Sequence, residues 1–181
     1  MEAMAELESA AEARSLLAAI RAGDRDAFTQ VVAAHDTDLL RFAFVVSGDP
    51  EAASDAVQAA WQRLWQQPPE LRDPSRLKSW LLTVTANEAR QTGRRNRRRG
   101  ALESEVASVA ASRDPGSDIG RLDLAPALAR LRVEDRELLA LRYVVELTSP
   151  EIAVHFGITP EGVRTRLHRV LERLRRDLSD G

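Results

Sequence analysis

A run of arginines near the C-terminus holds the side chains with the clearest chemistry in this sequence. From Arg164 to Arg176 the chain carries six arginines against one glutamate. Arginine can bond a guanine bidentately or bind a phosphate, and a nearby threonine can contact bases. This composition predicts a surface for a polyanion, and the alternative interpretation is the solvated face of an ordinary helix.

Two short helices separated by a tight turn are expected to position these arginines. Ser149-Pro150-Glu151 predicts a helix start with Ser149 as the cap, and Gly157 predicts the end of that helix. Thr159-Pro160-Glu161 predicts a second start of the same kind, with Thr159 as the cap. This pattern is typical of a helix-turn-helix, although a helical hairpin with a basic face remains the alternative.

The second of these helices has an apolar side and a polar side. Val163 and Leu167 fall at helical spacing and are expected to face the protein. The residues between them then face outward, where a helix-turn-helix contacts DNA. We therefore predict a DNA-binding set made of Glu161, Gly162, Arg164, Thr165, His168 and Arg169.

A second basic cluster lies earlier in the chain. Residues 70–100 have a net charge of +6, whereas residues 1–69 have a net charge of −6. An aromatic ring and an amide beside arginines suit unstacked single-stranded bases, and phosphate contacts suit the arginines that follow. A lone tryptophan is also a common core residue, so burial of Trp80 is the competing interpretation. The candidate set, at spacings of three or four residues, is Trp80, Thr83, Asn87, Arg90 and Arg94.

The composition of the 181-residue chain excludes several other functions. The sequence has no cysteine, which excludes a disulfide framework, a thiolate zinc site and a cysteine nucleophile. Its three histidines are isolated, and there is no phosphate-cradling glycine loop and no nucleophile–base–acid set, so we expect no metal, no cofactor and no catalytic residues. No apolar run approaches the roughly 20 residues of a membrane span, and the acidic N-terminus does not resemble a signal peptide, which predicts a cytoplasmic protein.

Helical periodicity dominates the chain and predicts an all-α fold. The expected architecture is two small helical domains joined by a flexible linker, the second containing a helix-turn-helix and no strands. We assign residues 1–13 to an acidic tail, 14–99 to the first domain, 100–121 to the linker and 122–181 to the second domain. The linker assignment rests on a small, polar, Gly/Ser/Pro-containing composition over about 20 residues.

Three segments of the chain resemble bacterial RNA polymerase sigma factors of the sigma-70 family, extracytoplasmic-function subfamily. Residues 55–66 (DAVQAAWQRLWQ) resemble the helix that binds core polymerase, and residues 76–99 resemble the segment that melts and reads the minus-ten element. Residues 131–178 resemble the domain that reads the minus-thirty-five element. The resemblance implies promoter-specific transcription initiation, for a stress or envelope regulon, with core-binding contacts at Asp55, Gln58, Trp61 and Arg63.

The resemblance to sigma factors also implies which macromolecules bind this protein. It implies core RNA polymerase and promoter DNA, with an anti-sigma factor as a further candidate. Ala59 stands where the family usually has an acid, which predicts weaker core binding. The alternative from another class is a helix-turn-helix regulator that binds DNA through its second domain and does not bind polymerase.

Overall fold

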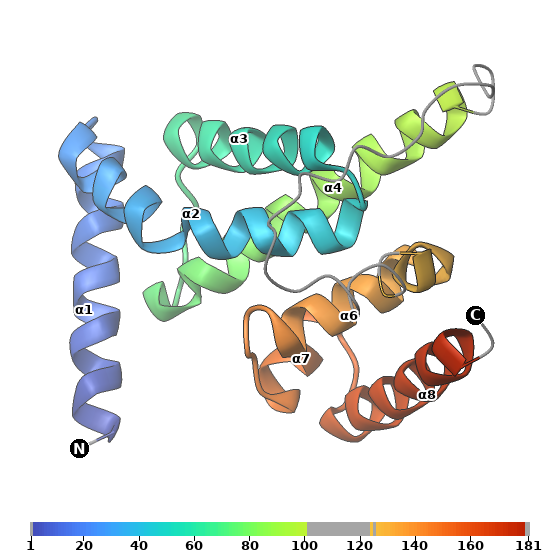
Figure 1. Ribbon diagram of the computed structural model, residues 1–181. Coiled ribbons are helices and arrows are strands. Elements are labelled where there is room, and N and C mark those ends of the chain that lie inside the picture. Colours follow the sequence, from blue (N-terminus) through green and yellow to red (C-terminus); the bar gives the residue numbers. More distant parts are fainter. Residues whose placement is uncertain (1, 101–123, 125, 180–181) are drawn as a thin grey trace, which may run out of the picture.

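The computed structural model describes residues 2–100, 124 and 126–179, and helices are the only regular elements in them (Figure 1). The prediction of an all-α fold is therefore confirmed over these ranges. Residues 101–121 of the predicted linker lie outside them. The helices of the first half are α1 (Glu2–Arg21), α2 (Arg25–Ser47), α3 (Pro50–Gln66), the 3-10 turn η1 (Pro74–Arg76) and α4 (Leu77–Gly100); those of the second half are α6 (Val133–Tyr143), α7 (Ser149–Phe156) and α8 (Pro160–Ser179).

Local sequence signals set the ends of α2 and α3. The Asp24 carboxylate accepts hydrogen bonds from the amides of the first turn of α2, and the helix ends at Gly48, which has a φ of 75°. This left-handed conformation suits glycine because it has no Cβ. Asp49 then caps α3 by accepting from the Ala52 amide at 2.6 Å, with Pro50 at the first helical position.

Two helix starts differ from the sequence-based expectation. Helix α1 begins at Glu2, so residues 2–13, assigned above to an acidic tail, are helical. Their alanine- and glutamate-rich composition has a high helix propensity, which explains the extension. Helix α7 is capped by Thr148 rather than Ser149, because the Thr148 amide and hydroxyl both donate to the Glu151 carboxylate, at 2.7 and 2.6 Å.

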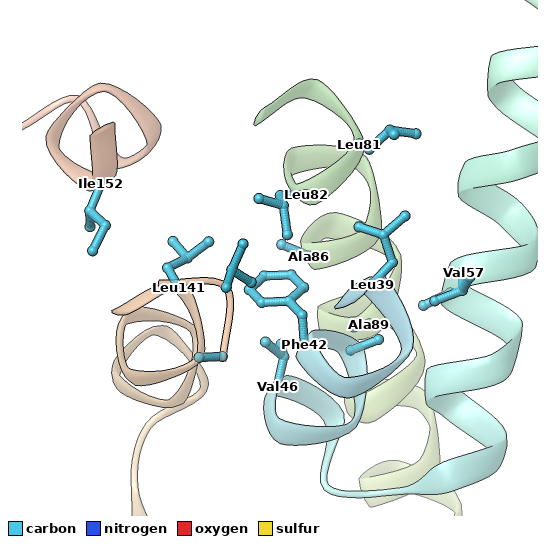
Figure 2. Packing of buried hydrophobic residues seen from close by; sticks show 14 of the residues in the cluster. Leu39, Phe42, Val46, Val57, Leu81, Leu82, Ala86, Ala89, Leu141 and Ile152 are labelled. Carbon is cyan, nitrogen blue, oxygen red and sulfur yellow. The ribbon is translucent and has the colours of Figure 1, made fainter. Parts of the chain in front are cut away.

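Helices α2, α3 and α4 pack against one another, and α6 of the second half packs directly on α2. Phe42 of α2 is completely buried at this junction. Its ring lies between Leu82 and Ala86 of α4 on one side and Leu141 of α6 on the other (Figure 2). The two halves of the chain therefore share one continuous hydrophobic core.

A buried arginine also joins the two halves. The Arg136 guanidinium, on α6, donates to the Val46 carbonyl oxygen at the end of α2 through Nε (3.0 Å) and Nη2 (2.8 Å). Its Nη1 donates to the Leu131 carbonyl at 3.2 Å. A cation at the C-terminal end of a helix interacts favourably with the helix dipole, so this contact stabilises the docked arrangement.

None of the described helices is long and apolar enough to cross a membrane.

Candidate functional site

Helix α8 separates its apolar and polar residues as the sequence predicts. Val163, Leu167 and Val170 are buried against the rest of the second half. Arg164, Thr165, His168 and Arg169 are all exposed. The proposed recognition face is therefore accessible to solvent, as contact with a major groove would require.

The start of α8 is built tightly. The Thr159 hydroxyl oxygen accepts a hydrogen bond from the Gly162 amide at 3.1 Å, which confirms Thr159 as the cap. A Cβ at position 162 would lie 3.3 Å from that same hydroxyl oxygen, so a larger residue would crowd the cap. The exposed carboxylate of Glu161 pairs with Arg164, which orients this guanidinium along the helix surface.

The exposed residues of α8 form two adjacent strips. Thr165 and Arg169, one turn apart, line a shallow groove of about 530 Å³ between α8 and the start of α6, together with Arg132 and Arg173. Arg164 and His168 lie one turn apart on the neighbouring strip, where His168 pairs with Glu172 at 3.3 Å. The groove adds a cation from the residue just before α6, Arg132, which the spacing of α8 alone could not reveal.

Asp135 holds α8 on α6. Its buried carboxylate accepts from Arg166 of α8 (Nη2 to Oδ1, 2.8 Å) and from Arg132 (Nε to Oδ2, 3.0 Å). Burial favours the neutral acid, but the hydrogen bonds from Arg132 and Arg166 outweigh it and lower the pKa of Asp135 below 3.8. The hydrogen bond to Asp135 also raises the pKa of Arg132.

The lowered pKa of Asp135 predicts an acid-sensitive contribution to stability. A depressed carboxylate pKa stabilises the folded state above 3.8, and this stabilisation is lost as the pH falls through the folded-state pKa. We expect Asp135→Asn to lower the free energy of unfolding at neutral pH, with a difference from the parent that shrinks as the pH is lowered from about 5 towards the folded-state pKa of Asp135. Urea unfolding across this range measures the difference. Asp55→Asn, on an exposed residue of α3, is the control. If the difference in unfolding free energy between Asp135→Asn and the parent stayed constant with pH, the lowered pKa assigned to Asp135 would be contradicted.

A second candidate surface is an apolar groove of about 630 Å³ between α2 and α3. Trp61 lines the groove, with its indole Nε1 donating to the Asp36 carboxylate at 2.8 Å. Phe28 meets Trp61 and Trp65 edge to face, at centroid distances of 6.2 and 5.2 Å. Aromatic residues in a partly open groove are characteristic of protein-binding hot spots.

The predicted core-binding residues divide between this groove and its surroundings. Gln58 and Trp61 line it, whereas Asp55 and Arg63 are exposed on α3 outside its lining. The sequence-based prediction missed Phe28 and Leu40, which enter the groove from α2. Leu40 is 42% exposed, so it adds apolar surface to the groove that a partner could contact.

The candidate minus-ten residues of α4 have different environments. Trp80 is half-buried and packs on the core, which favours the structural interpretation, whereas Thr83 and Asn87 are exposed. Arg90 is only 25% exposed, and its guanidinium donates to Asn87 and, at 2.9 Å, to Glu137 of α6. The side chain of Arg94 lies outside the described residues. Thr83, Asn87 and Arg90 thus lie on the side of α4 that borders the second half.

No three histidine, aspartate or glutamate side chains within residues 2–100, 124 and 126–179 come together as metal ligands. The arrangement instead offers an arginine-rich helix face, an aromatic groove and a polar strip on α4. These surfaces suit macromolecular partners rather than a small substrate.

Comparison with known proteins finds two family models that match successive parts of the chain. A model of sigma-70 region 2 matches residues 31–99, and a model of sigma-70 region 4 matches residues 121–174. The ECF RNA polymerase sigma factor SigL of Mycobacterium tuberculosis is 31% identical over 151 residues, covering 81% of this chain and 85% of its own. The sigma factor CarQ of Myxococcus xanthus is 31% identical over 163 residues, covering 88% of this chain and 94% of its own.

Solved structures share the arrangement of helices. CnrH in complex with the cytosolic domain of CnrY superposes with a TM-score of 0.69 at 26% identity, covering 93% of this chain and 98% of that chain. RpoE from Bartonella quintana, in complex with the anti-sigma factor NepR, gives a TM-score of 0.68 at 26% identity, covering 84% and 96%.

The fold and the two matched regions define a sigma factor. The chain belongs to the extracytoplasmic-function subfamily of the sigma-70 family, and it acts with RNA polymerase in promoter-specific transcription initiation.

Proposed function

We propose that the three surfaces described above divide the work of initiation among them. The aromatic groove between α2 and α3 docks on core polymerase, the polar side of α4 binds the unpaired minus-ten strand, and α8 reads the minus-thirty-five duplex. Polymerase supplies the catalysis, so no residue of this chain is assigned a catalytic role. The proposed place of action is the cytoplasm, where polymerase and promoter meet.

The groove is the observation that carries this proposal. A regulator that only binds DNA needs the face of α8 but has no use for a partly exposed aromatic cluster of Phe28, Trp61 and Trp65 in the other domain. Partly exposed aromatic residues in a groove favour a protein partner. An anti-sigma factor is proposed as a further partner, because RpoE and CnrH are each seen in complex with another protein.

The direct test is reconstitution with core polymerase. The full chain is mixed with core enzyme, and gel filtration followed by run-off transcription on fragments of genomic DNA measures complex formation and specific starts. We expect a stable complex and discrete transcripts that core enzyme alone does not make. Binding to duplex DNA without binding to core enzyme would favour the regulator interpretation.

The recognition helix gives a second prediction. We expect Arg164→Ala and Arg169→Ala each to weaken binding to a minus-thirty-five duplex by about 1–3 kcal/mol. A base-reading arginine should relax discrimination at one position, whereas a phosphate-binding one should weaken all sequences alike and lower the salt slope by about one. Titrations at several salt concentrations, with selected and mismatched duplexes, separate the two.

Arg175→Ala is the matched control for these variants. Arg175 is exposed on the same helix but lies more than one turn beyond Arg169, so it is expected to contact phosphate or solvent only. If Arg175→Ala lost affinity and discrimination while the other two variants did not, the orientation assigned to α8 on DNA would be wrong.

A further inference from the structure

Glu137 is a completely buried carboxylate at the junction of the two domains. Its Oε2 accepts a hydrogen bond from Nη1 of Arg90, on α4, at 2.9 Å. Its Oε1 lies 2.7 Å from Nε2 of His155, on α7. One side chain of α6 therefore connects the first domain to the helix-turn-helix of the second.

A further contact lies beside this cluster. The hydroxyl of Thr83, on α4, is 3.3 Å from Nδ1 of His155. Both Thr83 and Arg90 are candidate minus-ten residues, and both have their polar groups directed at the second domain. A buried carboxylate is costly unless its oxygens are paired, so Glu137 stabilises the docked arrangement only while its partners remain in place.

The outward-facing residues of the recognition helix are more accessible in the described structure. His168 and Arg164 have side chains that are 70% and 56% exposed, against 25% for Arg90. In the docked arrangement the minus-thirty-five surface is accessible, whereas Arg90 is engaged with Glu137. The two proposed DNA-binding surfaces therefore differ in availability within one conformation.

We propose that Glu137 is the centre of an internal latch that closes the two domains and withholds Arg90 from single-stranded DNA. Opening the latch frees Arg90 on the polar side of α4 and leaves the face of α8 unchanged. The free protein then meets a promoter through its second domain first. The role of Arg90 in this proposal rests on the proposed function of α4, whereas the latch itself does not.

The distance between the two domains tests the latch directly. The chain has no cysteine, so Thr37→Cys on α2 and Ser179→Cys at the end of α8, both at exposed positions, accept two spin labels without competing sites. Pulsed electron paramagnetic resonance on the full chain then gives the distribution of inter-label distances. In the labelled parent we expect one narrow population of distances, and opening should add a second, broader population.

Glu137→Gln keeps the shape of the side chain and removes its charge. We expect it to raise the ratio of open to closed molecules by roughly tenfold to a hundredfold, the range for losing a hydrogen bond between charged groups. Arg90→Gln attacks the same contact from the other domain and should have a similar effect, which guards against local misfolding in α6. Glu151→Gln is the matched control, because Glu151 bonds only to Thr148 within the second domain in the contacts described above.

A parent-like distance distribution in both Glu137→Gln and Arg90→Gln would overturn the latch, as would a broad distribution in the labelled parent itself. Binding of a fluorescent oligo-dT strand to the same proteins separates the latch from the role of Arg90. Opening with tighter oligo-dT binding by Glu137→Gln supports both parts of the proposal. Opening without any gain in oligo-dT binding supports the latch and overturns the assignment of Arg90 to single-stranded DNA.

Discussion

Replacing Phe42 by alanine is expected to lower the free energy of unfolding by about 3–5 kcal/mol. The ring is completely buried and packs between α4 and α6, so truncation leaves a cavity that neither domain can fill alone. Urea unfolding followed by circular dichroism measures the loss. Because Phe42 contributes to the packing of both domains, we also expect the variant to unfold in two separated transitions rather than one.

Phe44→Ala is the control for this prediction. It is the same substitution on the same helix, two residues away, but the Phe44 side chain is 50% exposed. Its truncation should cost much less, since little apolar surface returns to water and no cavity forms. Equal losses in the two variants would mean that Phe42 does not occupy the junction as described.

Replacing Trp61 by alanine is expected to weaken binding to core polymerase by about 2–4 kcal/mol, which is roughly 30-fold to 1,000-fold in affinity. The indole lines the groove, and its loss also removes the edge-to-face contact with Phe28 and leaves Asp36 without the indole N–H. Fluorescence anisotropy of the labelled chain titrated with core enzyme measures the change.

Two further variants separate docking from folding. Trp61→Phe keeps an aromatic ring in the groove but loses the hydrogen bond to Asp36, so it should retain most of the affinity. Tyr143→Ala removes an aromatic side chain that is 56% exposed on the second domain, and it should leave core binding unchanged. Parent-like binding by Trp61→Ala, with an unchanged unfolding transition, would place the docking surface elsewhere.

Local signals account for the parts of this fold that the sequence predicts. Interactions between residues only a few positions apart form the caps at Asp49 and Thr159 and the turn at Gly157. These features can therefore be predicted from the local sequence. Apolar periodicity likewise identifies the buried side of α8 and, by exclusion, its exposed residues. The cap of α7 differs by one position because Thr148 and Ser149 are both good caps, and the reach of Glu151 decides between them.

Local sequence signals could not predict the contacts between segments that are far apart in the chain. Arg90 and Glu137 are separated by 47 positions, and nothing in the periodicity of either helix indicates that they meet. A charged residue on a helix is usually solvated, so Glu137 and Arg136 gave no sign that they are buried. Trp80 had two interpretations for the same reason, since only tertiary packing distinguishes a core tryptophan from an exposed one.

The hydrogen bonds between Arg136 and the Val46 carbonyl join two halves of a single polypeptide, so they need not be as strong as contacts between separate proteins. A covalent tether keeps each half at an effective concentration that is on the order of millimolar for the other, whatever the dilution of the protein. A few buried polar contacts then suffice to keep the halves associated. A protease cut between residues 100 and 121 would remove the tether, and the association would become concentration-dependent, as between any two weakly binding proteins.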